Sequence, residues 1–113
     1  VAEAITTGNP MGGDEIIHKA YKYGWLAESV TEDEIIESQK LLAESGYFVE
    51  PASATPLYAI KKLRESGKIE KTATVVKILT GSGLKDMTVL RYHKFNVTLV
   101  NVNDVEKALS NVK

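Results

Sequence analysis

The chain has 113 residues, of which 43% are hydrophobic and 26% are charged, proportions that are typical of one globular domain. Its 14 basic and 15 acidic residues give a net charge of -1, so the charge balance indicates no nucleic-acid partner. The absence of cysteine excludes disulfides and thiolate metal sites. Apolar runs are too short to span a membrane and the first five residues do not resemble a signal peptide, so we expect a cytoplasmic protein.

The N-terminal part is predicted to hold a loop, a helix and a strand. Gly and Pro residues between Gly8 and Gly13 break any periodicity, which indicates a loop. Asp14 can cap the helix that follows, and Gly24 can end it with a positive φ. Residues 25–30 are partly apolar and favour a short strand.

A second helix is predicted from the pair Thr31 and Glu34. These residues form a capping box, in which the Thr31 side chain accepts from the Glu34 N–H and the Glu34 side chain bonds back. Gly46 is expected to end this helix. Residues 47–49 are the next strand candidate.

A third helix is expected after Pro51 and before Gly67. Pro56 is predicted to lie in its first turn, where no intrahelical N–H bond is lost. Residues 72–79 then give the clearest strand, because Thr, Val and Ile dominate them. Their apolar core is more continuous than alternating, which is typical of a strand covered on both faces.

The tail is predicted to hold one more strand and one more helix. Residues 80–83 form a loop, and a last strand lies within residues 95–102. Asn103 or Asp104 is expected to cap a terminal helix that reaches about Val112. Strands that alternate with helices of this length indicate the α/β class. The fold prediction is therefore a single domain over residues 1–113, with a three-layer parallel sheet and helices on both faces.

Four segments resemble the threonine synthase family. Residues 45–54 (SGYFVEPASA) are similar to its Gly-x-Phe-x-Glu-Pro-Ala-Ser-Ala segment, and residues 79–86 (LTGSGLKD) to its Leu-Thr-Gly-x-Gly-Leu-Lys-Asp segment. Residues 4–10 (AITTGNP) and 30–35 (VTEDEI) resemble two further segments. All four occur in the family's order and near its spacing. The chain thus resembles the C-terminal part of a threonine synthase, a tryptophan-synthase-like (fold type II) enzyme that depends on pyridoxal 5'-phosphate (PLP).

The resemblance implies a lyase of threonine biosynthesis, which converts O-phosphohomoserine and water to threonine and phosphate. PLP acts as the electron sink in such an enzyme, and the protein supplies orientation and electrostatics. The matching positions imply that the Thr80 hydroxyl faces the pyridine nitrogen and that Glu50 lies near the cofactor. Gly81 would let backbone pass close to the ring, and Asn9 would lie in a loop bordering it.

The resemblance also implies that the chain holds no catalytic residue of its own. The family's Schiff-base lysine lies far upstream of the Gly8-Asn9-Pro10 segment, and no Gly-rich loop opens a helix here to cradle the cofactor phosphate. We therefore expect the isolated chain to be inactive and not to bind PLP. Its expected partner is the missing N-terminal catalytic portion. Apolar surface that this portion would cover is expected to make the chain self-associate.

Other interpretations of the same residues stay open. Residues 80–83 can be a plain turn, Glu50 a helix-start acid and Ser53 a helix N-cap. The whole chain can then be a non-catalytic α/β binding module. A third alternative is a piece of a related PLP-dependent dehydratase or cysteine synthase. Ser82 stands where several threonine synthases have His or Asn, so transfer of residue roles is weakest there.

The histidines and several lysines are expected to be solvated or packed. His18 and His93 are far apart in the sequence and indicate no metal site. Lys61 and Lys62 are expected on the wet face of the third helix, and Lys85 in the loop after the last central strand. None of these lysines has the desolvated setting that activates an amine.

Overall fold

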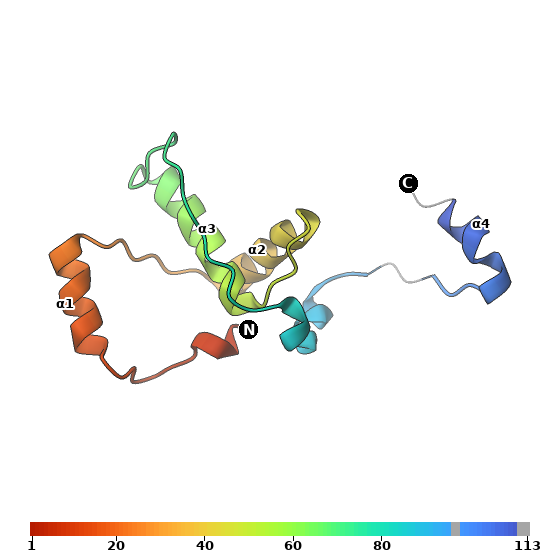
Figure 1. Ribbon diagram of the computed structural model, residues 1–113, viewed down its shortest axis with the longest axis horizontal. Helices are drawn as coiled ribbons and strands as arrows, with labels where there is room; N and C mark the ends of the chain where they lie inside the picture. The colour runs from red at the N-terminus through yellow and green to blue at the C-terminus, as the bar shows by residue number, and fades with distance from the viewer. Residues whose placement is uncertain (96–97, 111–113) are drawn as a thin grey trace.

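A computed structural model describes residues 1–95 and 98–110 of the chain. Four α-helices follow one another in chain order: α1 (Gly13–Tyr23), α2 (Glu32–Glu44), α3 (Pro51–Glu65) and α4 (Val105–Leu109) (Figure 1). Short 3₁₀ turns lie at Glu3–Ile5, Gly83–Lys85, Met87–Tyr92 and Val102–Asp104.

The fold is open, and its centre is the pair α2 and α3. The radius of gyration is 18.7 Å, whereas a compact domain of this length has about 13 Å. Figure 1 shows α2 and α3 crossing in the middle, while α1 and α4 project to opposite sides. A small apolar core gathers around the central pair, with Ile35, Val49, Ala54, Leu63 and Val89 buried.

The predicted parallel sheet is not present in the described residues. The backbone pairing there that has β geometry is a single antiparallel bridge between Val49 and Ser82. Residues 25–30 and 72–79 form no ladder. The physical reason is that a strand exists only where a neighbouring strand takes up its N–H and C=O groups, and these segments find no such neighbour. Of the last predicted strand, residues 96 and 97 lie outside the described residues, and the described remainder forms no ladder.

Residues 72–79 instead run back along α3 in the opposite direction (Figure 1). Near the end of α3, the Arg64 guanidinium donates to the Ala73 carbonyl. Near its start, Lys77 Nζ donates to the Ala54 carbonyl at 3.5 Å. Burial against the helix lowers the pKa of Lys77. One side of this segment is thus covered, but Val76 is 86% exposed and Ile78 77%.

The boundaries of α1 and α4 agree with the prediction in part. Gly12, with φ 77°, occupies the N-cap of α1, so Asp14 lies in the first turn and does not cap it. Gly24, with φ 63°, ends α1 as predicted. Asp104 takes the N-cap position of α4 without a capping hydrogen bond. The helix ends at Leu109, and residues 111–113, to which its predicted end extends, lie outside the described residues.

The prediction for Pro56 is wrong. The helix α3 begins at Pro51, whose fixed φ suits the first helical position, so Pro56 lies inside the helix. Pro56 has no N–H for the Ala52 carbonyl one turn earlier.

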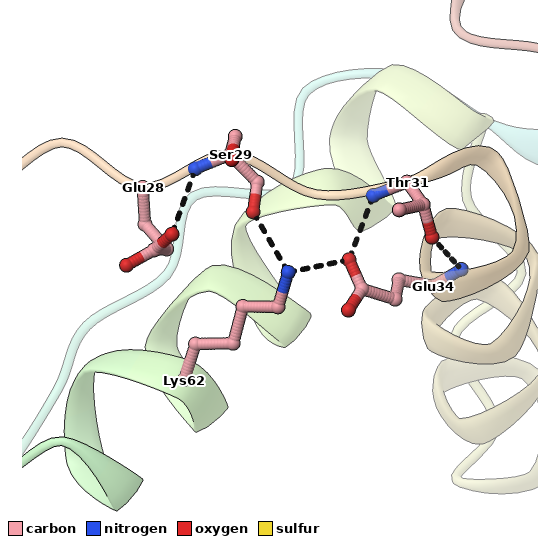
Figure 2. Close-up of polar contacts among 5 residues, drawn as sticks. All are labelled: Glu28, Ser29, Thr31, Glu34 and Lys62. Carbon is pink, nitrogen blue, oxygen red and sulfur yellow. Dashed lines mark hydrogen bonds and ion pairs between the residues drawn. The ribbon is translucent and has the colours of Figure 1, made fainter.

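The N-terminus of α2 is held by a polar network that also reaches α3 (Figure 2). The capping box is confirmed, because Thr31 Oγ1 accepts from the Glu34 N–H at 3.3 Å and the Thr31 N–H donates to Glu34 Oε2 at 2.7 Å. Lys62 Nζ donates to the same Glu34 oxygen at 2.8 Å and to the Ser29 carbonyl at 3.0 Å. Lys62 therefore ties α3 to α2, whereas its charged head was predicted to lie in water. Lys61 remains exposed, above the Tyr58 ring.

Neither a membrane-crossing helix nor a cluster of metal ligands is found in residues 1–95 and 98–110. None of the helices there has the length and apolar character needed to cross a membrane. No group of three or more His, Cys, Asp or Glu side chains in that part of the chain is placed to hold a metal ion.

Acid is predicted to loosen the contact between α2 and α3 through Glu34. The hydrogen bond from Lys62, with that from the Thr31 N–H, lowers the pKa of Glu34. A carboxyl group with a lowered folded-state pKa stabilises the fold above its ordinary pKa of about 4.3, and that contribution is lost as the pH falls through the folded pKa. Glu34→Gln should therefore reduce the pH dependence of the unfolding free energy below about pH 5.

The measurement is urea unfolding followed by far-ultraviolet circular dichroism across this pH range. Glu15→Gln is the matched control, because Glu15 pairs with Lys19 on the exposed surface of α1 at 2.7 Å and should contribute little. Equal pH dependence in wild type and Glu34→Gln would contradict the assignment.

Candidate functional site

The start of α3 places two polar side chains in the protein interior. Glu50 is the N-cap residue, with extended backbone, and Ser53 lies three positions later in the first turn. Glu50 is 8% exposed and Ser53 4%. Residues three apart lie on the same side of a helix, so both side chains face the same direction. That side is met by the loop that begins at Thr80.

Ser53 Oγ is the centre of this polar cluster. It accepts from the Gly81 N–H at 2.9 Å and donates to Glu50 Oε1 at 3.3 Å. It is also 2.8 Å from Thr80 Oγ1, a distance at which either hydroxyl can donate. A backbone bond from the Glu50 N–H to the Gly81 carbonyl, 3.0 Å long, closes the cluster from the other side.

The direction of the Ser53 hydrogen bonds determines whether the Thr80 hydroxyl can donate to a ligand or only accept from it. A serine hydroxyl has one proton and two lone pairs. If the Ser53 proton goes to Glu50 and one lone pair takes the Gly81 N–H, the remaining lone pair accepts the Thr80 proton. Thr80, which is an exposed residue, then offers only the lone pairs of its oxygen to a ligand. If Ser53 turns its proton toward Thr80, the Thr80 proton is released for donation.

Two glycines allow the loop to approach α3 this closely. A Cβ at Gly81 would lie 2.0 Å from Glu50 Oε1, and one at Gly83 would lie 2.5 Å from the Phe48 ring. The Gly83 N–H also donates to the Phe48 carbonyl at 3.0 Å. Within this chain, the glycines are thus required by the contact between loop and helix start.

A small cavity of about 260 Å³ lies beside the cluster. Its walls include Glu50, Pro51, Lys85 and Asp86, together with residues 1–4. Lys85 Nζ is 3.5 Å from Glu50 Oε2, and its side chain is mostly in solvent. Hydrogen bonding from Thr88 lowers the pKa of Asp86. Lys85 is thus mostly in solvent and paired with Glu50; as predicted, it has no desolvated setting that would activate its amine.

The structure brings together three of the four residues singled out from the sequence. Glu50, Thr80 and Gly81 meet around Ser53 Oγ. Asn9 is exposed in the loop between the first 3₁₀ turn and α1, and this loop leads away from the start of α3 in Figure 1. No contact in the described residues joins Asn9 to the cluster.

Ser53 has a more central place in the site than the sequence predicts. Ser53 was expected to be an N-cap, but Glu50 occupies that position because Pro51 takes the first helical residue. The signal that identifies Ser53 is its spacing of three from Glu50, which puts both on one side of the helix start.

Comparisons with known proteins agree with the resemblance seen in the sequence. Residues 1–81 match the family described as pyridoxal-phosphate dependent enzyme. The chain is 48% identical to the threonine synthase of Methanocaldococcus jannaschii over 87 residues, which are 76% of this chain and 22% of that protein. It is 36% identical to the threonine synthase of a Bacillus species over 115 residues, which are 100% of this chain and 32% of that protein.

A plant relative, the chloroplastic threonine synthase 2 of Arabidopsis thaliana, is 32% identical over 97 residues, which are 85% of this chain and 19% of that protein. The chain therefore spans between about a fifth and a third of the length of these relatives. With a match that covers most of its length, the chain belongs to the family of pyridoxal-phosphate dependent enzymes.

Proposed function

We propose that this chain is the C-terminal part of a threonine synthase and forms one wall of its PLP site. The enzyme would convert O-phosphohomoserine and water to threonine and phosphate. The observation that carries the proposal is the hydrogen-bonded cluster in which Ser53 joins Thr80, Gly81 and Glu50. The relatives named above are threonine synthases, which supports the same assignment.

The cluster fits one edge of a pyridine ring. Thr80 is an exposed residue, and its hydroxyl has hydrogen-bonding capacity left over after its contact with Ser53. PLP, when bound, would supply the electron sink for the reaction. Thr80 would hold the ring nitrogen through a neutral hydroxyl, and Ser53 would decide whether that hydroxyl donates or accepts. Glu50 would act on Thr80 through Ser53, because its hydrogen bond is to the Ser53 hydroxyl.

This chain would depend on the rest of the enzyme for catalysis. The Schiff-base lysine of the family lies upstream of the Gly8-Asn9-Pro10 segment, and Lys85 beside the cluster is solvated. We therefore infer that the isolated chain is inactive and that its partner is the N-terminal catalytic portion. We also infer that the enzyme is cytoplasmic.

Apolar side chains on α1 and after it offer a surface for that partner. Ile16, Ile17 and Tyr21 on α1 are exposed, and so are Trp25 and Leu26. Exposed apolar side chains that gather on one surface favour association in water. Without the rest of the enzyme, this surface favours contact with a second copy.

Replacing the Thr80 hydroxyl in the full-length enzyme tests the proposed function. Thr80→Val keeps the shape of the side chain and removes its hydrogen bonds, and Thr80→Ser keeps the hydroxyl. With PLP and O-phosphohomoserine, wild type and Thr80→Ser should release phosphate. Thr80→Val should lose roughly tenfold or more in kcat, which corresponds to about 1.4 kcal/mol in the barrier. A wild-type enzyme that binds PLP but releases no phosphate would refute the proposal.

Adding a methyl group at Gly81 is predicted to disrupt the cluster. The new Cβ overlaps the Glu50 carboxylate, so the loop or the helix start must shift. Gly81→Ala should destabilise the fold by about 1–3 kcal/mol and weaken PLP retention by the full-length enzyme. Gly8→Ala is the control for thermal unfolding, because a Cβ there meets open space. Cofactor absorbance is compared with that of wild type, and equal thermal unfolding of the two variants would argue against the close approach.

The isolated chain is predicted to self-associate through α1. Ile17 and Tyr21 lie four residues apart on one side of this helix, and both are exposed. Replacing both with Lys should shift the chain toward monomer in sedimentation velocity and reduce its binding of an apolar dye. Lys22→Gln on the same helix should change neither. A wild-type chain that is monomeric and binds no dye would contradict the prediction.

A further inference from the structure

A buried amide, Gln39, connects α2 to the residue before Glu50. Gln39 lies in the middle of α2 and is 0% exposed. Its Nε2 donates to the Val49 carbonyl at 2.7 Å. Burying a polar side chain completely is costly unless its hydrogen bonds are made, so the two ends of this amide must both be accounted for.

The second end of the amide contacts His93. The Val49 carbonyl can only accept, so Nε2 of Gln39 must face it and Oε1 must face away. Oε1 lies 2.8 Å from His93 Nε2. That oxygen accepts, and His93 must therefore carry a proton on Nε2. Both the Nε2–H neutral ring and the doubly protonated ring meet this requirement, so the contact does not depend on the charge of His93.

The contact with Val49 bears directly on the position of Glu50. One peptide unit joins the two residues, and both of its polar groups are held. Its C=O accepts from Gln39, and its N–H, which belongs to Glu50, donates to the Gly81 carbonyl at 3.0 Å. The two bonds come from opposite sides of the chain, one from α2 and one from the loop. A peptide plane fixed at both ends has little freedom to rotate, and it sets the direction in which the Glu50 side chain leaves the backbone.

We propose that Gln39 is a positioning residue for Glu50 and the PLP-facing wall, and that His93 locks the Gln39 amide in the required orientation. This inference rests on the proposed function, because it takes the cluster at Glu50 to be part of the cofactor site. His93 lies beyond residue 81, where the family match ends. The inference therefore gives the segment that follows the matched region a role in the site.

The first experiment needs no reaction. Hydrogen exchange of the Glu50 amide is measured in the full-length protein for wild type, Gln39→Leu and Gln39→Glu. Gln39→Glu keeps the shape but turns an acceptor toward the Val49 carbonyl. Both variants should speed exchange at Glu50 by roughly tenfold or more, since the peptide loses one of its two anchors. Lys40→Met, on the exposed side of α2, is the control and should leave it unchanged.

The second experiment separates positioning from support of the fold. In the full-length enzyme, Gln39→Leu and His93→Phe should lower kcat by roughly tenfold, with a smaller change in KM, and should alter the visible absorbance of bound PLP. His93→Gln should restore both, because its amide can donate from about the same place as Nε2. Rescue by this variant, which cannot titrate, also tests the statement that the charge of His93 is not required.

The two experiments distinguish failure of this inference from failure of the proposed function. If the Gln39 and His93 variants melt at lower temperature but retain wild-type kcat and cofactor absorbance, the residues are merely structural and the inference is wrong. Unchanged exchange at Glu50 in Gln39→Leu would overturn it independently of any activity. A wild-type enzyme without phosphate release refutes the proposed function instead, and the exchange result still decides whether Gln39 positions Glu50.

Discussion

The backbone contact between residues 48–50 and residues 81–83 is the constraint on which the rest of the structure depends. It consists of two hydrogen bonds, from the Glu50 N–H to the Gly81 carbonyl and from the Gly83 N–H to the Phe48 carbonyl, each 3.0 Å long. The contact closes a loop of about thirty residues that contains all of α3. Closing such a loop costs entropy, which the buried side chains of α3 and the cluster at Ser53 help to offset. This closure brings Thr80 and Gly81 to Ser53 at the start of α3.

The same contact explains why small residues and hydroxyl groups occur together here. Gly81 gives the loop room against the Glu50 carboxylate, and Ser53 supplies the hydrogen bond that the Gly81 N–H needs. The buried carboxylate in turn accepts a hydrogen bond from the Ser53 hydroxyl and forms an ion pair with the Lys85 ammonium. Each group satisfies another, as buried polar groups must. The arrangement leaves the Thr80 hydroxyl with hydrogen-bonding capacity beyond its contact with Ser53.

The sequence predicts the local features of this chain well and the long-range ones poorly, for a physical reason. The capping box at Thr31 and the helix stop at Gly24 depend on residues within one turn, so spacing alone is enough to predict them. The resemblance located Glu50, Thr80 and Gly81, which do meet. The contact between Gln39 and His93 joins residues 54 positions apart, and no local pattern contains that information. Pro56 and Ser53 were misplaced because the start of α3 depends on Pro51.

The predicted sheet, which the described residues do not form, also depends on long-range contacts. A segment rich in Thr, Val and Ile has the side chains of a covered strand, but hydrogen bonds of a strand come from its neighbours. Residues 72–79 have α3 on one side, while Val76 and Ile78 remain in solvent. The relatives are three to five times longer than the matched region. A longer polypeptide can provide strands on the open edges of this segment, and placing them there would bury the apolar side chains that this chain leaves exposed. The composition of residues 72–79 is thus that of a strand covered on both faces, whereas α3 covers this segment on one side.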